Sequence, residues 1–87
     1  MLTMSTGRAP FRHINDEAVV FDGLDDAIIG TGGQHNSLQL VIYSARLIIE
    51  VLMNQSEMSH EEAIEHFNFN IASLNAGPGT PIIMWEA

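Results

Sequence analysis

The chain has 87 residues, 46% of them hydrophobic, and it contains no cysteine. This size and composition are typical of one small globular domain, and the lack of cysteine excludes disulfides and thiolate metal sites. Eleven acidic residues, three arginines and no lysine give a net charge of −8. Because phosphate backbones are bound by lysine and arginine, this charge argues against direct nucleic-acid binding and favours a protein partner with a basic surface.

The apolar runs of the chain are too short to cross a membrane. The longest unbroken ones are 18–21, 40–43 and 82–85, whereas a span needs about 20 apolar residues. The first ten residues also lack the apolar segment of a signal peptide. We therefore expect a cytoplasmic protein with no membrane contact. Since a core of this size leaves little stability to spare, we also expect a homo-oligomer, with a twofold dimer as the simplest case.

The first half of the chain predicts an arm and three short strands. Residues 1–15 mix Thr, Ser, Gly and Pro without periodicity and are predicted to be a flexible arm before a single domain at 16–87. The apolar run 18–21 ends at Asp22-Gly23, and the run 27–30 is followed by Thr31-Gly32-Gly33. These runs predict two short strands, or a strand and a tight turn. Residues 38–43 are the clearest strand, because they are rich in β-forming residues and bounded by turn formers.

A first helix is predicted from Ser44, which can cap it, to about residue 54. Its apolar residues form a stripe that is widened on one side: Leu47, Ile48, Val51, Leu52, then Ile49 and Met53. A helix that is apolar over so much of its circumference must pack on more than one side. This pattern indicates a subunit interface.

A second helix is predicted over 59–75. Ser59 and Glu62 have the spacing of a capping box, in which each residue bonds the other's backbone N–H. One apolar face follows at short helical intervals: Ile64, Phe67, Ile71 and Leu74. Phe69 lies about 200° around the helix from Phe67 and points away from that face. Together with Trp85 it can mark a protein interface, where aromatic residues are enriched.

A closing strand at 82–85 follows the two helices. The order of elements is thus strands, two helices and one strand. Such an order predicts an α+β fold, with a small, mainly antiparallel sheet and two consecutive helices packed on one face.

Two groups of side chains have the chemistry of metal ligands. Glu62 and His66 share a helix face, but no third ligand has a diagnostic spacing. Asp22, Asp25 and Asp26 form a carboxylate cluster that can bind a hard cation, although Asp is also common in turns for its local hydrogen bonds. We favour a solvated helix face and an ordinary turn, and we predict neither a metal nor another cofactor.

The segment Gly30-Thr31-Gly32-Gly33 invites comparison with a phosphate-binding loop. The P-loop requires a lysine, which this chain lacks, so only backbone N–H groups are left to hold an anion and a plain turn is favoured. No serine stands in a Gly-x-Ser-x-Gly setting. Because no nucleophile, base and oxyanion donor converge in the sequence, we predict a protein that is not an enzyme.

Several strings between Phe21 and Ile83 carry a resemblance to a known group of proteins. They are Asp25-Asp26-Ala27-Ile28-Ile29-Gly30, Tyr43, Ile49-Glu50-Val51-Leu52-Met53, Met58-Ser59-x-Glu61-Glu62-Ala63, Phe67-x-Phe69-Asn70 and Gly79-Thr80-Pro81. In these strings the chain resembles a group of small bacteriophage-encoded proteins. The resemblance implies a phage or prophage source and an accessory role, such as inhibition of host machinery or of antiviral defence. It transfers no catalytic or binding residues.

Two functional hypotheses follow. In the first, a non-enzymatic phage accessory protein binds and inhibits a host or antiviral-defence complex, as anti-CRISPR proteins do, through an acidic surface with the residues Glu57, Glu61, Glu62, Glu65 and Phe69. In the alternative, an oligomer sequesters a nucleotide or other anionic signal through Arg46, Gly32 and Gly33, helped by Arg8 and Arg12. Acidic residues on the outside of the second helix would favour the first hypothesis. Convergence of Arg46 with the glycine turn would favour the second.

Overall fold

The computed structural model describes residues 4–6, 17–34, 39–74, 77 and 79–86. Its strands are β1 (Met4–Ser5), β2 (Val20–Phe21), β3 (Ile28–Gly32), β4 (Leu40–Ser44) and β5 (Ile82–Met84). Its helices are α1 (Ala45–Gln55) and α2 (His60–Phe67), with a 3-10 turn at Asp25–Ala27 and a π-helical turn at Asn68–Ala72.

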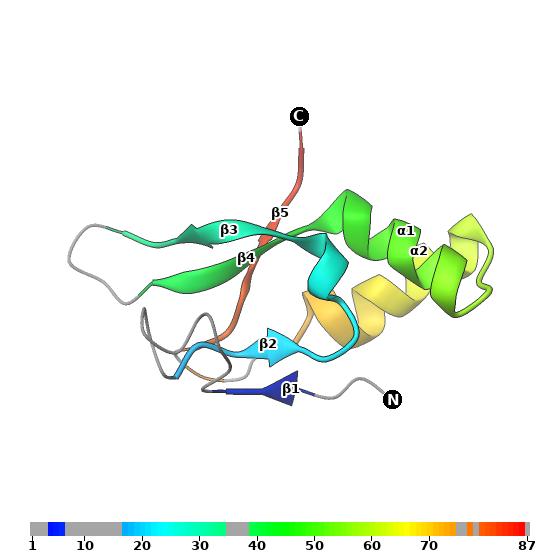
Figure 1. Cartoon of the computed structure of the whole chain (residues 1–87). Coiled ribbons are helices and arrows are strands. Elements are labelled where there is room, and N and C mark those ends of the chain that lie inside the picture. The colour runs from blue at the N-terminus through cyan, green and yellow to red at the C-terminus, as the bar shows by residue number, and fades with distance from the viewer. Residues whose placement is uncertain (1–3, 7–16, 35–38, 75–76, 78, 87) are drawn as a thin grey trace.

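The strands form two small sheets (Figure 1). β1 and β2 make an antiparallel ribbon, while β3, β4 and β5 make a mixed sheet with β4 in the centre. β3 and β4 are antiparallel, whereas β5 joins β4 in parallel, because the chain passes through both helices before it returns. The predicted α+β fold with two consecutive helices is confirmed.

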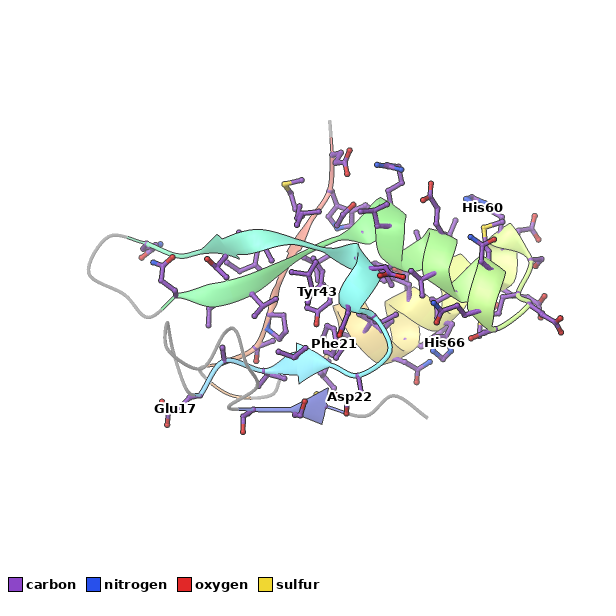
Figure 2. All side chains as sticks on the ribbon, viewed as in Figure 1. Glu17, Phe21, Asp22, Tyr43, His60 and His66 are labelled. Atoms are coloured by element: carbon purple, nitrogen blue, oxygen red, sulfur yellow. The ribbon has the colours of Figure 1, made fainter. Side chains whose placement is uncertain are left out.

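One core joins these elements. Its largest fully buried side chains include Phe21 of β2, Tyr43 of β4, Ile48 of α1 and Phe67 of α2. The Phe21 N–H donates a hydrogen bond to the Tyr43 hydroxyl (2.8 Å), and the two ring centroids lie 5.0 Å apart. Figure 2 shows Tyr43 directed from the sheet towards Phe21. This buried contact fastens the two-stranded ribbon to the three-stranded sheet.

Both predicted helix starts are confirmed. Ser44 caps α1 by accepting from the Leu47 N–H, and Ser59 and Glu62 form the full capping box of α2. The predicted second helix is interrupted, because the α-helical part ends at Phe67 and a π-helical turn continues to Ala72. The expected apolar face is kept: Phe67 and Ile71 are buried, and Ile64 and Leu74 are half-buried.

The beginning of the chain contains a strand that the sequence did not predict. Met4 and Ser5, inside the expected arm, pair with Phe21 and Val20, and the Ser5 hydroxyl donates to Asp22 (2.9 Å). Residues 1–3 and 7–15 of that arm, with Arg8 and Arg12, lie outside the described residues. The expected flexibility of the arm therefore stays a prediction.

A close backbone contact holds the segment before β5 against the segment before β2. The Val19 N–H donates to the Gly79 carbonyl (3.0 Å). A side chain at position 79 would collide with the carbonyl oxygen of Glu17. Only glycine fits this approach, which directs the chain into β5.

Candidate protein-binding surface

The outward face of α2 and of the π-helical turn that follows it presents a row of polar side chains and one aromatic ring. Ala63, Phe67 and Ile71 face the core. The opposite row, at i, i+3, i+4 and i+7, consists of Glu62, Glu65, His66 and Phe69. His66 is half-buried, the two glutamates are exposed, and Phe69 is 74% exposed.

These side chains line a shallow hollow of about 350 Å³, which we name the outer hollow. Its lining residues are Met58, Glu62, Glu65, His66, Phe69 and Asn70. The structure thus brings together three of the five residues predicted to bind a partner. Sequence analysis did not include Met58, His66 and Asn70 in the partner-binding set. Helical spacing had placed His66 on the face of Glu62, but only as a candidate metal ligand.

The other two predicted residues, Glu57 and Glu61, are also exposed. In sequence they are next to Met58 and Glu62, which line the hollow. Glu57 has a backbone φ of 54°, in the left-handed region that favours glycine. Such a conformation in a residue with a side chain costs about 1 kcal/mol or more, and such strain clusters at functional sites. No described residue pairs with the carboxylates of Glu57, Glu61 and Glu65. These three charges are available to a partner.

Glu62 differs from its neighbours, because its carboxylate is held by the helix start. The Ser59 N–H donates to Glu62 Oε1 (3.0 Å), and Ser59 Oγ accepts from the Glu62 N–H (3.2 Å). The backbone hydrogen bond from Ser59, followed by the side-chain bond, lowers the pKa of Glu62 from its ordinary 4.5. Glu62 therefore keeps its charge at neutral pH while it also stabilises the helix.

The π-helical turn displays Phe69. Within it, Asn70 Nδ2 donates to the His66 carbonyl (3.2 Å), and Ser73 Oγ donates to the Phe69 carbonyl (3.0 Å). These side-chain bonds satisfy carbonyl groups in competition with the regular α-helical pattern. Single π turns inside helices often occur at functional sites. Here the turn carries the most exposed large hydrophobic side chain of the described residues.

A second concave surface lies on another side of α2, between it, α1 and the segment after β5. We name it the helix groove. Its volume is about 560 Å³, and its lining residues are Arg46, Ile49, Glu50, Met53, His60, Ile64, Trp85 and Glu86. Figure 2 shows His60, at the groove, and His66, at the outer hollow, on opposite sides of the helices in this view. Phe69 and Trp85, which sequence analysis grouped together, therefore line different surfaces.

The residues of the anion-binding alternative do not share a pocket. Gly32 pairs with Leu40 at the start of β4, whereas Arg46 lies in α1, which begins at the other end of that strand (Figure 1). Gly33 follows Gly32 and is exposed. Arg46 also pairs with Glu50 (3.0 Å) and Glu86 (3.6 Å). The geometry gives the anion site no common cavity.

The two groups with metal-ligand chemistry have other roles in the structure. No cluster of three or more His, Asp or Glu side chains suited to a metal occurs among the described residues. Asp22 accepts from Ser5, and Asp25 and Asp26 begin a 3-10 turn. Glu62 and His66 share the outer hollow, where Glu62 bonds Ser59 and His66 Nδ1 lies 3.3 Å from Asn70 Nδ2.

The described part of the chain exposes many more carboxylates than cations. It contains ten carboxylate side chains, all of them exposed, and a single guanidinium, that of Arg46. No described helix combines the length and apolar character needed to cross a bilayer.

Comparison of the chain with protein-family models, curated proteins and solved structures gave no match.

Proposed function

We propose that this chain is a non-enzymatic accessory protein of a phage or prophage. In this proposal it acts in the cytoplasm of the host cell, where it binds and inhibits a host or antiviral-defence protein complex, in the manner of an anti-CRISPR protein. The binding surface is the outward face of α2 with the outer hollow. The partner is a protein with a basic surface.

One observation carries the proposal. The carboxylates of Glu57, Glu61 and Glu65 are exposed and have no partner among the described residues, and the exposed ring of Phe69 lies in the same hollow as Glu65. An aromatic residue surrounded by polar groups is the usual composition of a protein interface. Leaving both kinds of group exposed has no benefit for folding that the described contacts account for.

The charge defines how such a protein inhibits its target. A surface with this density of carboxylates competes for a basic groove that otherwise holds nucleic acid. Association between opposite charges is fast and weakens as salt rises. The sequence resemblance to small bacteriophage proteins supports the source and the accessory role. The lack of a common cavity for Arg46, Gly32 and Gly33 leaves the anion-binding alternative without geometric support.

Charge reversal at α2 tests the proposal. The triple variant Glu57→Lys/Glu61→Lys/Glu65→Lys leaves the capping residue Glu62 in place. The matched control is Glu17→Lys/Asp25→Lys/Asp26→Lys, which reverses three exposed carboxylates on other elements. Each reversal changes the charge by two, so both variants have a net charge of −2.

The measurement is affinity capture from host lysate at low and high salt. We expect the parent and the control to retain the same basic protein, which high salt releases, and the α2 variant to lose it. Equal capture by both variants would refute the acidic face of α2 as the binding surface. Capture of no basic protein by the parent would refute the proposed function itself.

A further inference from the structure

The helix groove has an apolar floor and a charged rim. Ile49 and Met53 of α1, Ile64 of α2 and Trp85 after β5 form the floor. The rim consists of Arg46, Glu50, His60 and Glu86. On α1, the lining positions 46, 49, 50 and 53 follow one another at i, i+3, i+4 and i+7, so a single helix face supplies half of the groove.

The floor is left incompletely covered by the fold. Ile49 is nearly buried, but Met53 and Ile64 are only half-buried and Trp85 is 63% exposed. Trp85 contacts the core through an edge-to-face arrangement with Phe67, with ring centroids 5.3 Å apart. Exposed tryptophan next to a concave apolar surface is typical of binding hot spots. The groove volume also lies within the roughly 300–1,000 Å³ range of ligand pockets.

The rim favours an occupant that brings positive charge. Arg46 bonds Glu50 and Glu86, and Glu86 Oε1 also accepts from the Ser44 hydroxyl (2.9 Å). The side chains of this ion-pair network are 41–57% exposed, and ion pairs so exposed are weak. The rim thus has two carboxylates for one guanidinium, beside the His60 imidazole, and its carboxylates would attract a cation that an occupant brings.

The same charges argue against a second copy of the chain as the occupant. Each copy has a net charge of −8, and its described residues expose ten carboxylates and one guanidinium. Two such surfaces repel each other, whereas a basic segment is attracted to the rim. The apolar floor then needs an apolar side chain from that segment.

We propose that the helix groove binds a basic amphipathic segment of a partner protein, which places an aliphatic or aromatic side chain on Trp85, Met53 and Ile64 and a Lys or Arg beside Glu50 and Glu86. This inference rests on the proposed function and extends it. The outer face of α2 supplies long-range attraction, while the groove selects partners with an apolar anchor among basic residues.

The experiment uses three fluorescein-labelled helical peptides of about 14 residues, or about four turns. The first has Leu at i, i+3, i+4 and i+7 and Lys elsewhere. The second replaces every Leu by Ser, and the third replaces every Lys by Glu. Peptide anisotropy measures the affinity. Since Trp85 is the only tryptophan of the chain, its emission reports directly on the groove.

We expect the Leu/Lys peptide to bind and shift the emission of Trp85 to shorter wavelength. The Ser/Lys peptide should bind about tenfold more weakly and leave the emission unchanged, because it has no anchor to bury. The Leu/Glu peptide should not bind. Equal binding of the Ser/Lys and Leu/Lys peptides, or an unchanged Trp85 emission, would overturn the inference.

Variants locate the site. Met53→Ser should weaken the Leu/Lys peptide about tenfold, whereas Met4→Ser, at an exposed methionine of β1 outside the groove, should have no effect. Circular dichroism checks that both are folded. Trp85→Ser, measured by anisotropy, is a second groove variant and should weaken binding at least as much. Equal affinity of the Leu/Lys peptide for Met53→Ser, Trp85→Ser and Met4→Ser would overturn the inference.

The same titrations separate this inference from the proposed function. If Met53→Ser weakens binding and the triple α2 variant does not, the groove is correct and the acidic face is not the binding surface. If only the triple variant weakens binding, the acidic face is correct and the groove inference fails. A mass of twice 9.6 kDa by light scattering, with Trp85 emission that depends on protein concentration, would show that a second copy covers the groove and would also overturn it.

Discussion

The two helices begin with the same residue in opposite surroundings. Ser44, before α1, is fully buried, and its hydroxyl bonds both the Leu47 N–H (3.3 Å) and the Glu86 carboxylate (2.9 Å). Ser59, before α2, is exposed, and its hydroxyl accepts from the Glu62 N–H of its own capping box. The cap at Ser44 connects α1 to Glu86, which follows β5 and is distant in sequence. The cap at Ser59 involves only residues within one helical turn, so the sequence alone predicts it.

This difference extends to the faces that the helices offer. α1 lies at the junction of β4, the core and the segment after β5, and its rim arginine is paired on both sides. α2 carries its carboxylates outward, and three of those in its vicinity are unpaired among the described residues. The buried side-chain hydrogen bonds named above are therefore those of Ser44 and Tyr43, while the three unpaired carboxylates lie on α2 and just before it.

Among substitutions of polar groups, the largest loss of stability should come from the buried hydrogen bond between Phe21 and Tyr43. Tyr43→Phe removes the hydroxyl that accepts from the buried Phe21 N–H. An unsatisfied buried donor costs about 1–3 kcal/mol, so urea denaturation should show a loss of unfolding free energy in this range. Phe69→Leu, at an exposed ring, is the control and should change stability by only a few tenths of a kcal/mol. Equal effects would contradict the placement of Tyr43 at the junction of the two sheets.

The loss of unfolding free energy should come next in size when a capping serine is replaced, and it should be larger for Ser44 than for Ser59. Ser44→Ala removes a helix cap and the hydrogen bond to Glu86 together, and we expect a loss of about 2 kcal/mol, the upper end of capping effects. Because the side chain is buried, water cannot replace it. Thermal denaturation measures the loss. In the double variant with Glu86→Gln, the two changes should be less than additive, since they share one bond.

Ser59→Ala should cost about 1 kcal/mol, because it removes an exposed cap whose backbone N–H partner can turn to water. The measurement is urea denaturation followed by circular dichroism. Ser56→Ala, at an exposed serine just after α1 that caps no helix start, is the matched control and should have little effect. A loss for Ser59→Ala larger than that for Ser44→Ala would reverse the comparison between the two helix starts.

The features that the sequence predicted correctly are local ones. The cap at Ser44, the capping box at Ser59 and Glu62, and the buried face through Phe67 each depend on residues within a few positions of one another. Their hydrogen bonds and their helical periodicity can therefore be predicted from residues that are close together in the sequence. The α+β class follows from the order in which these local elements occur.

The features that the sequence missed depend on distant contacts. β1 exists because Met4 and Ser5 meet β2, and β5 is parallel because Ile82 and Ile83 pair with Ile42 and Tyr43. The two-residue strand β1 carries almost no signal of its own, and the run that predicts a strand at 82–85 does not indicate its direction. The same holds for the surfaces: helical spacing predicts that Glu62, Glu65 and Phe69 share a face, but only the fold brings Trp85 to α1 and Met58 to the outer hollow.

The smallest predicted effect is a pH dependence of stability that comes from Glu62. The hydrogen bonds from Ser59 lower the pKa of Glu62 below its ordinary 4.5 in the folded protein. A lowered folded-state pKa means that the charged form stabilises the fold. The contribution is fully present above 4.5 and is lost as the pH falls through the folded-state pKa.

Glu62→Gln isolates this contribution, because glutamine can still accept the Ser59 N–H in a capping box but does not titrate. We expect the parent to lose more stability than Glu62→Gln between about pH 6 and about pH 2, as measured by urea midpoints. The matched control is Glu65→Gln, one helical turn further on, whose carboxylate has no partner among the described residues. This variant keeps the hydrogen bonds between Ser59 and Glu62, so the contribution of Glu62 should remain in it. If Glu65→Gln instead removes the pH dependence and Glu62→Gln does not, the acidic face of α2 contributes to folding, and its carboxylates are not free for a partner.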